Sequence, residues 1–346
     1  MNKPLFFNRI GTLLVLLAVM FTSCSESFLY DDEGDCSVHY RIKFKYDRNM
    51  KFADAFGKEV TSVALYVFDR SGVLVHAGSE SGAALADDSY AMPVELAPGE
   101  YDMLAWCGLG DAASFEVPQG LVGVTTKKEV TCRMNRTSEN GYGKVDADLA
   151  PLFHGAAKVV LSGEPGIHTE TISLTKNTNV VRVVLQQLSG EDFDLDAFSF
   201  EIQDYNGYMA HDNSLLQDEL IVYEPWSLQT GNADINAEIY NDDKTRAPST
   251  VGVAVAEMTV GRLVDDANPI LVVRNKKNGD VVLSIPLVDY ALLVKGNYNK
   301  AMSNQEYLDR QDEYNMTFFL DEAGRWISSS IVVNSWRVVL NNQTIR

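Results

Sequence analysis

Apolar residues recur at every second position along most of this chain, a pattern typical of strands that bury one face. In SVHYRIKFKY, residues 37–46, apolar positions alternate with a histidine and three basic residues. This pattern predicts a half-buried antiparallel strand. Segments 60–69 and 73–78 flank the turn sequence DRSG, so we expect them to form a hairpin. A second strand–turn–strand unit is predicted at 90–107, around a Pro-Gly turn.

The same pattern resumes in the second half of the chain. The segments that read as strands are 171–175, 180–188, 198–203, 314–320 and 330–340. The dipeptide Asn206-Gly207 predicts a tight hairpin, and a second hairpin is expected at 270–287 with its turn near Asn278-Gly279.

Only two segments depart from this strand pattern. Ser303 and Glu306 have the spacing of a capping box and predict a short helix near residue 305. Residues 133–148, RMNRTSENGYGKVDAD, show no apolar periodicity and are interpreted as a long loop. Many short strands with frequent turn signals indicate an all-β chain of two tandem β-sandwich domains. We expect these domains at 36–168 and 169–346, because a chain of this length favours two.

The N-terminal segment has the features of an export signal. Two basic residues precede an apolar run at 10–21, which is too short to cross a bilayer as a helix. The sequence FTSC that follows resembles a bacterial lipobox, whose cysteine carries lipid. We therefore predict a lipoprotein signal peptide at 1–23, lipid attachment at Cys24 and a lipidated polar tether at 24–35. The alternative is a plain secreted protein in which Cys24 merely falls near the cleavage site.

The net charge of the chain limits the classes of partner that it is expected to bind. The formal net charge is -19, and removal of residues 1–23, which hold two cations and no acid, makes it -21. Such a surface repels phosphate backbones, so a nucleic-acid partner is not expected. Three cysteines remain besides Cys24, and an oxidising compartment would let one pair form a disulfide. Their number is odd, and the sequence leaves the pairing of Cys36, Cys107 and Cys132 open.

Signals for catalysis or cofactor binding are weak. GLGDAA, residues 108–113, matches a dinucleotide-binding pattern, but a proline at 118 would break the required helix, so we interpret the glycines as loop residues. Asp204, Asn206 and Asp212 are close in sequence and form a weak calcium candidate without EF-hand spacing. The four tryptophans could bind sugars, although strand tryptophans are more often core residues. We predict no enzyme activity, no cofactor and no small-molecule substrate.

Several stretches, in one order along nearly the whole mature chain, resemble the fimbrial anchor subunits of Gram-negative outer membranes, the FimB-like or minor-fimbria-anchor family. They are LYDDEGDC, FKYDRNMKFADAF, VALYVFD, APGEYDMLAWCGL, LFHG, LTKNTNVVRVVL, DYNGYMAHDN, QEYLDRQDEYNMTFFLD and IVVNSWRVV. The resemblance implies two transthyretin-like β-sandwiches and no catalytic residues. It also implies a surface-exposed lipoprotein, acylated at Cys24, that anchors a fimbrium to the cell outer membrane and limits its length.

The implied partners are a fimbrial shaft subunit, which would pair with a strand edge, and the outer membrane, held through the lipid. Two alternatives remain open: a surface lipoprotein that binds glycan or host protein, and a tip or shaft pilin of the same superfamily. The resemblance implies that related shaft subunits lose their lipidated N-terminal segment to a protease that cuts after an arginine, which opens a groove for the next subunit's strand. Here the strand at 37–46 is strongly patterned, so a cut at Arg41 would meet a protected backbone, and we expect the strand to be retained.

Overall fold

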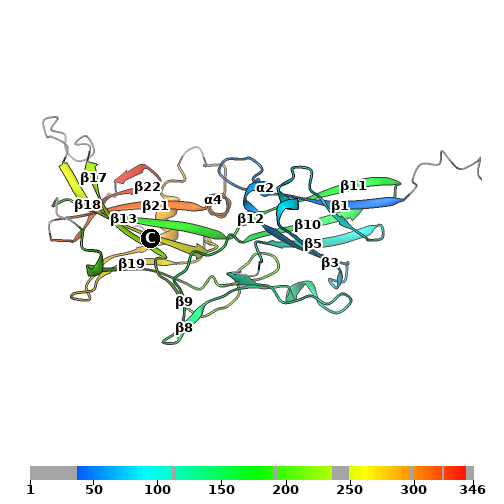
Figure 1. The fold of residues 1–346 in the computed structure, drawn as a ribbon, viewed down its shortest axis with the longest axis horizontal. Helices are drawn as coiled ribbons and strands as arrows, with labels where there is room; N and C mark the ends of the chain where they lie inside the picture. Colours follow the sequence, from blue (N-terminus) through cyan, green and yellow to red (C-terminus); the bar gives the residue numbers. More distant parts are fainter. Residues whose placement is uncertain are drawn as a thin grey trace, which may run out of the picture.

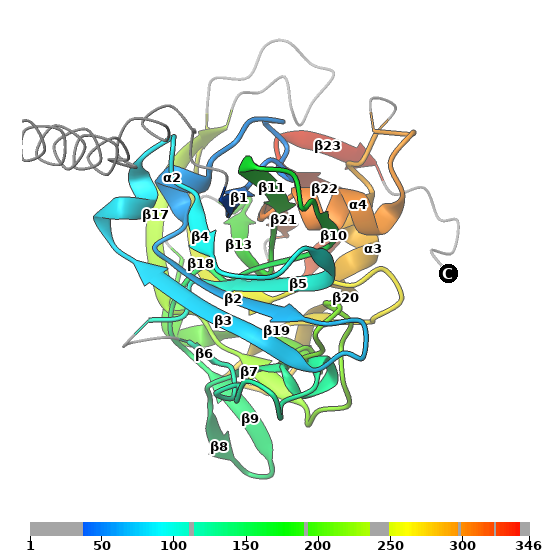
Figure 2. The same cartoon turned by 90° about the vertical axis from the view of Figure 1, so that its right-hand side faces the viewer.

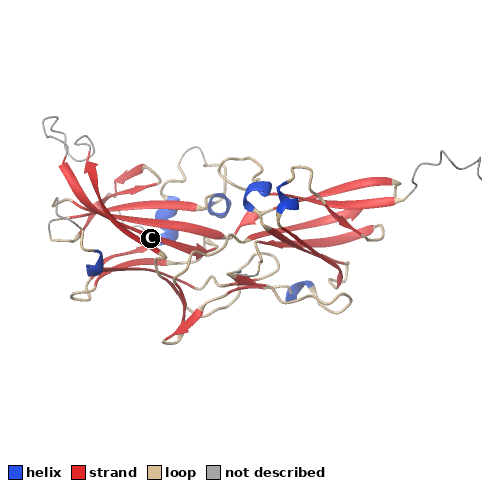
Figure 3. Cartoon of the chain, in the orientation of Figure 1, coloured by secondary structure: helices blue, strands red, loops and turns tan. Residues whose placement is uncertain are grey.

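The computed structural model describes residues 37–110, 114–189, 193–235, 249–296, 299–321 and 323–339. Strands dominate this part of the chain and the helices are short, which confirms the all-β prediction (Figure 3). The strands form two sandwich units that lie end to end along the long axis of the molecule (Figure 1). Within the described ranges, no helix has the length and apolar character needed to cross a membrane.

The first unit packs two sheets around one core, seen end-on in Figure 2. Its five-stranded sheet has the order β12-β10-β5-β2-β3, with bounds Thr175–Lys176, Phe153–Leu161, Gly99–Cys107, Ser62–Phe68 and Leu74–Ser81. Its three-stranded sheet has the order β11-β1-β4, with bounds Gly166–Ser173, Val38–Lys45 and Met92–Val94. Side chains such as Ile42, Leu65 and Phe153 meet in a shared apolar cluster between the sheets.

Strand β1 follows the predicted burial pattern but not the predicted pairing. Tyr40, Ile42 and Phe44 are buried, whereas Arg41 between them is exposed. However, β1 pairs in parallel with β11 and antiparallel only with β4. The prediction of a half-buried antiparallel strand is therefore correct for burial and for the β4 side but wrong for the β11 side, because alternation reports which face is buried and not the direction of the neighbour. The backbone of β1 is hydrogen-bonded along both edges.

The predicted hairpin of β2 and β3 is confirmed. Asp69 Oδ1 accepts from the Ser71 amide at 2.8 Å, the Ser71 hydroxyl at 2.6 Å and the Val73 amide at 3.1 Å, which fixes the turn. The strand–turn–strand unit at 90–107 differs from a hairpin, because β4 and β5 belong to opposite sheets of the sandwich.

The second unit contains the larger core. One six-stranded sheet has the order β17-β18-β13-β21-β22-β23, with bounds Ser227–Ile235, Ser249–Gly261, Thr178–Gln187, Glu313–Leu320, Trp326–Val333 and Trp336–Val339. The other has the order β20-β19-β14-β16-β9-β8, with bounds Val281–Pro286, Ile270–Asn275, Phe198–Asp204, Ile221–Tyr223, Tyr142–Val145 and Thr137–Glu139. The predicted hairpin of β19 and β20 is confirmed.

The predicted loop at 133–148 was wrong. It contains the hairpin of β8 and β9, and β9 pairs in parallel with β16 of the second unit. These strands are short and β8 is exposed throughout, so they carry no apolar alternation. A small sheet, β15-β7-β6 with bounds Tyr208–Met209, Cys132–Met134 and Phe115–Glu116, lies beside them. Residues from 115–152 therefore join the core of the second unit, which interlocks the two units.

The chain passes from the first unit to the second at Asn177, between β12 and β13. A division after residue 168 falls inside β11, which pairs with β1 along its whole length. The predicted Asn206-Gly207 hairpin was also wrong. The flanking strands β14 and β15 lie in different sheets, and Asn206 is fully buried. Its side chain accepts a hydrogen bond from the Tyr223 hydroxyl and donates to Arg262 O at 3.2 Å.

Three α-helical segments complete the described chain: α2 at Phe56–Glu59, α3 at Leu287–Leu292 and α4 at Asn304–Arg310. The predicted helix after Ser303 is α4, and the prediction is confirmed. The Ser303 hydroxyl accepts from the Glu306 amide at 3.0 Å, as an N-cap does. The Glu306 carboxylate does not complete a capping box but accepts from Arg310 Nε at 3.1 Å.

Candidate functional site

The terminal hairpin, β22 and β23, forms one margin of the large sheet in the second unit. Its turn residues, Asn334 and Ser335, have φ values of 47° and 69°, the left-handed pair that a two-residue hairpin turn needs. Asn334 Oδ1 accepts from the Asn315 amide at 2.8 Å, which ties the turn to β21. Among the described strands, β23 pairs only with β22, so its outer edge has no described strand neighbour.

A groove of about 640 Å³ lies beside this edge. Its wall comes from β23, the segment after α3, helix α4 and a loop of the first unit. The residues that line it are Met50, Leu293, Val294, Lys295, Gly296, Asn299, Tyr307, Gln311, Asn334, Trp336, Arg337 and Val338. Trp336 pairs with buried Val333 and therefore projects on the core side of the sheet, yet 65% of it is exposed because it lies past the sheet margin. Its indole is the largest apolar surface at the groove.

The groove differs in charge from the rest of the protein. Two cations, Lys295 and Arg337, line it, and no described Asp or Glu does, although the whole chain carries -19. Lys295 Nζ donates to Asn304 Oδ1 at 2.9 Å, and Arg337 Nε donates to the Ser330 hydroxyl at 3.2 Å. These contacts hold both cations near the groove. An extended segment with apolar and acidic residues is the ligand that such a surface accommodates best.

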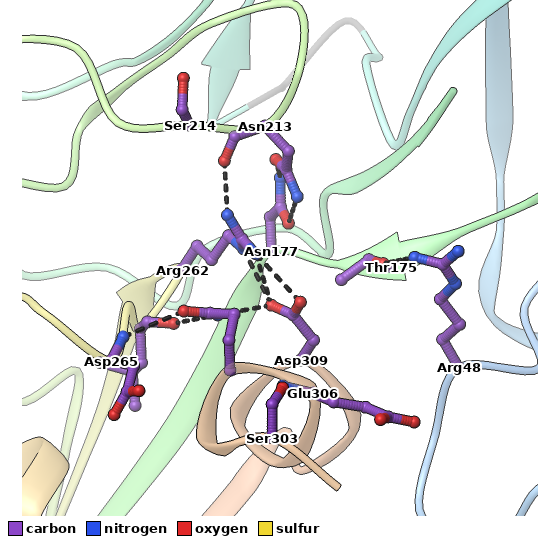
Figure 4. Close-up of polar contacts among 12 residues, drawn as sticks. Arg48, Thr175, Asn177, Asn213, Ser214, Arg262, Asp265, Ser303, Glu306 and Asp309 are labelled. Atoms are coloured by element: carbon purple, nitrogen blue, oxygen red, sulfur yellow. Dashed lines mark hydrogen bonds and ion pairs between the residues drawn. The ribbon is translucent and has the colours of Figure 1, made fainter. Parts of the chain in front are cut away.

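Helix α4 connects the groove to a polar junction between the two units (Figure 4). Arg262 donates to both carboxylate oxygens of Asp309, at 2.9 and 3.0 Å, and also to Asn213 O. The amides of Asn177 and Asn213 bond reciprocally, at 2.6 and 3.1 Å. Bidentate and reciprocal contacts of this kind fix orientation as well as distance. Apart from Asn177, where the chain passes between the units, these residues belong to the second unit, so the contacts fix helix α4 and the groove beside it within that unit.

Two contacts at this junction join residues of the first unit to residues of the second. Lys176 Nζ donates to Asp312 at 2.8 Å and to Glu59 at 3.2 Å, and these two carboxylates raise the pKa of the lysine despite its burial. His154 Nε2 donates to His211 O at 2.9 Å. Burial lowers the pKa of His154 to about 4, so this imidazole is neutral at pH 7. Neither group is placed to act on a substrate.

The calcium candidates serve the fold in this structure. Asp204 is buried, and its Oδ1 accepts from the Tyr205 amide at 2.8 Å. Asp212 Oδ1 accepts from the Ser214 hydroxyl at 2.6 Å and closes a turn. Asn206 is bonded to Tyr223 and Arg262 as described above. Across the described residues, no group of three or more acidic, histidine or cysteine side chains is arranged to hold a metal ion.

The other residues singled out from the sequence divide between core and surface. Gly108 has a φ of 90°, and a Cβ there would lie 1.9 Å from Pro151 O, so the glycine is required by a close backbone approach. Residues 111–113 of the same motif, like Cys24 and Cys36, lie outside the described residues. Cys107 and Cys132 are buried free thiols, and burial raises the pKa of each. Trp106 is fully buried, whereas Trp336 is not a core residue.

Known proteins with a similar sequence or structure identify the family of this chain. The family described as fimbrillin-A associated anchor proteins Mfa1 and Mfa2 matches residues 32–342. This chain belongs to that family. The minor fimbrium anchoring subunit Mfa2 of Porphyromonas gingivalis is 23% identical over 249 residues, which are 68% of this chain and 73% of that protein.

Solved structures support the fold of this anchor-family chain. A candidate polysaccharide-binding protein of Bacteroides thetaiotaomicron is 33% identical with a TM-score of 0.75, over 88% of this chain and 99% of that one. The fimbrial anchor protein Mfa2 of P. gingivalis has a TM-score of 0.64 at 17% identity, over 88% of this chain and all of that one. The description of the family names anchor proteins associated with fimbrillin.

The sequence missed most of the groove. Met50, Leu293 and Val294 come from segments far from β23 and follow no periodic pattern. The segment 330–340 was predicted as one strand, and this was wrong: it holds the end of β22, a tight turn at Asn334 and Ser335, and β23. The groove arises where the margin of one sheet meets the helices that close the end of the sandwich.

Proposed function

We propose that this chain is an outer-membrane lipoprotein, acylated at Cys24, that anchors a fimbrium to the cell surface and limits its length. In this proposal the fimbrial subunit adds a strand to the outer edge of β23, and its side chains enter the adjacent groove. Membership of the anchor family supports the general role. The observation that carries the specific proposal is an edge of β23 without a described strand neighbour, beside a groove lined by an exposed tryptophan and by no described carboxylate.

Strand addition suits this edge for a physical reason. Backbone hydrogen bonds to β23 would form with an incoming strand of any sequence and would supply affinity. The groove would select among the side chains of that strand. Lys176, bonded to Asp312, and His154, bonded to His211 O, join the two units, so force applied at β23 would pass through these contacts to the first unit and the lipid tether. An anchor that ends a polymer needs both properties.

A photo-crosslinking amino acid in place of Trp336 tests the proposal in cells that assemble fimbriae. We expect a crosslinked product that contains the fimbrial subunit. The matched control carries the same amino acid in place of Leu228, which is 44% exposed on β17, the opposite margin of the same sheet. Equal products from both positions, or a product only from Leu228, would contradict docking at β23.

A second candidate function is glycan binding. It is favoured by the exposed indole of Trp336 and by the similarity to a candidate polysaccharide-binding protein. Sugar rings stack on exposed tryptophan faces, and amide side chains such as Asn299 and Gln311 could bond their hydroxyls. Saturable binding of a glycan by the isolated chain, lost in Trp336→Ala, would favour this function. Crosslinking to a fimbrial subunit without glycan binding would favour the anchor.

A further inference from the structure

The loop at 117–126, VPQGLVGVTT, is uncharged and carries a cluster of exposed apolar side chains. Leu121, Val122 and Val124 are 60%, 59% and 69% exposed. Single exposed aliphatic residues are common and need no explanation, but three within four positions on an acidic protein form a coherent apolar tip. We call these three residues the apolar tip.

Backbone hydrogen bonds hold this loop in place. The Leu121 amide donates to the Thr125 hydroxyl at 2.8 Å, and the Thr125 amide donates to Leu121 O at 2.9 Å. Leu74, at the start of β3, donates to Thr125 O and accepts from the Gly123 amide, both at 2.8 Å. The loop is thus fixed to the turn between β2 and β3, with the apolar tip pointing to solvent.

The apolar tip lies at the end of the molecule where the N-terminal tether begins. In the five-stranded sheet, Phe68 at the end of β2 pairs with Asp102, close to the start of β5. The start of β5, Gly99, pairs with Leu161 at the end of β10. The chain then turns into β11, whose first residue donates to Ser37 O at 3.0 Å. Figure 1 shows β1, β3 and β11 at this end.

Two more exposed apolar residues belong to the same end. Val160 is 70% exposed near the end of β10, and Ile167 is 60% exposed near the start of β11. With the apolar tip they make five exposed large apolar side chains at this end, but Val160 and Ile167 lie on the outer faces of the two opposite sheets and do not form one patch with each other. In the second unit the exposed apolar residues are scattered over separate strands and loops.

We propose that this end is a membrane-contact face, and that the apolar tip enters the interfacial layer of the lipid that holds the acyl chains. The inference rests on the proposed acylation of Cys24. The tether of residues 24–36 spans at most about 45 Å when fully extended, so it keeps this end close to the bilayer. Such tethering raises the effective concentration of the loop at the surface, and even weak insertion would then be populated.

The charge of the protein also favours the loop as the point of contact. The acidic surface is repelled by anionic lipid, but the loop offers ten residues without a carboxylate, and the exposed Lys128 and Glu129 that follow it offset each other in charge. Aliphatic side chains that leave water for the acyl boundary are stabilised there. Contact at the apolar tip would set the direction of the long axis of the molecule relative to the membrane, and hence the direction in which β23 points.

The acylated full chain, reconstituted in phosphatidylethanolamine–phosphatidylglycerol vesicles, tests the inference. An environment-sensitive fluorophore is attached at Val122→Cys in a Cys36→Ser background, since Cys107 and Cys132 are buried. We expect a quencher attached to lipid tails to lower its emission at least about threefold. The matched control is Val281→Cys, which is 50% exposed on the second unit and should not be quenched.

Substitution of the neighbouring residues supplies the second arm. Leu121→Ser with Val124→Ser should abolish quenching at position 122 and leave the unfolding midpoint unchanged, because both side chains are exposed. Absence of quenching in a chain that stays with the vesicles would overturn the membrane face and leave acylation intact. A chain that leaves the vesicles would refute acylation and the inference together. Equal quenching at 122 and 281, or a response at 122 only after a fimbrial fraction is added, would also overturn it.

Discussion

The two ends of this molecule expose apolar side chains in different settings. At the tether end, Leu121, Val122 and Val124 project from an uncharged loop whose backbone is hydrogen-bonded to Leu74 of β3. At the terminal hairpin, Trp336 projects beside a groove and a strand edge that has no described strand neighbour, with cations nearby. The first setting offers apolar contact without direction, which suits a fluid surface. The second offers backbone bonds and a shaped cavity, which suit one extended chain.

The first prediction tests whether membrane attachment at the tether end is independent of docking at β23. Cys24→Ala should remove the lipid and release the chain from the membrane, because no other described feature anchors it permanently. Metabolic labelling with a fatty-acid probe should mark the wild type and miss the variant, and membrane fractionation should follow the label. Docking at β23 should survive in the released chain. Equal labelling of both proteins would show that Cys24 is not the lipid site.

The second prediction concerns the ion pair that holds helix α4 beside the groove. Arg262→Ala leaves the carboxylate of Asp309, which is 18% exposed as a side chain, without its bidentate partner. Loss of one member of such a pair should lower the free energy of unfolding by about 3 kcal/mol, measured by urea denaturation. The control is Arg70→Ala, whose pair with Glu100 has side chains that are 73% and 54% exposed, and it should cost less than about 1 kcal/mol. Similar losses in both variants would argue against a special role for the junction.

The third prediction concerns two carboxylates, one in each unit, whose contributions to stability should depend on pH in opposite ways. Burial raises the pKa of Asp204, in the second unit, to about 6. The folded state then binds this proton more tightly than the unfolded state does, so its contribution to stability grows as pH falls from above 6 to about 4. Asp204→Asn should therefore raise the free energy of unfolding by about 2 kcal/mol at pH 7.5 and have little effect near pH 4.

A surface carboxylate of the first unit supplies the control for this prediction. Hydrogen bonds from Ser71 lower the pKa of Asp69, so its contribution is present above the unfolded pKa and is lost as pH falls. Asp69→Asn should therefore have the opposite pH dependence, and a small one because Asp69 is solvated. Denaturant titrations of both variants across pH would measure the difference. The same sign for both would contradict the assignment.

The last prediction expects no cleavage within β1. Arg41 is exposed, but its backbone pairs with Thr169 on one side and Pro93 on the other, so a protease cannot bind it as an extended strand. We expect peptide mapping of the protein from assembled fimbriae to show an intact first strand. A new N-terminus at Ile42 or Asn49, with the lipidated fragment lost, would identify a polymerising subunit instead of an anchor.

Local pattern by itself determined the elements with one buried face or a specific turn. The alternation in 37–46, the turns at Asp69 and Asn278 and the cap at Ser303 all appear in the structure as predicted. Each depends on residues within one turn or strand, where side-chain periodicity and dihedral preference act directly. The all-β class follows from the sum of these local preferences.

Only the tertiary structure decided which strands pair and where function can reside. The parallel neighbour of β1, the recruitment of β9 into the second unit and the burial of Asn206 depend on segments tens of residues away. The groove beside Trp336 likewise joins the first unit, two helical segments and the last strand. Contacts between such distant segments are set by how sheets and their connections close around shared cores, and no spacing along the chain records that geometry.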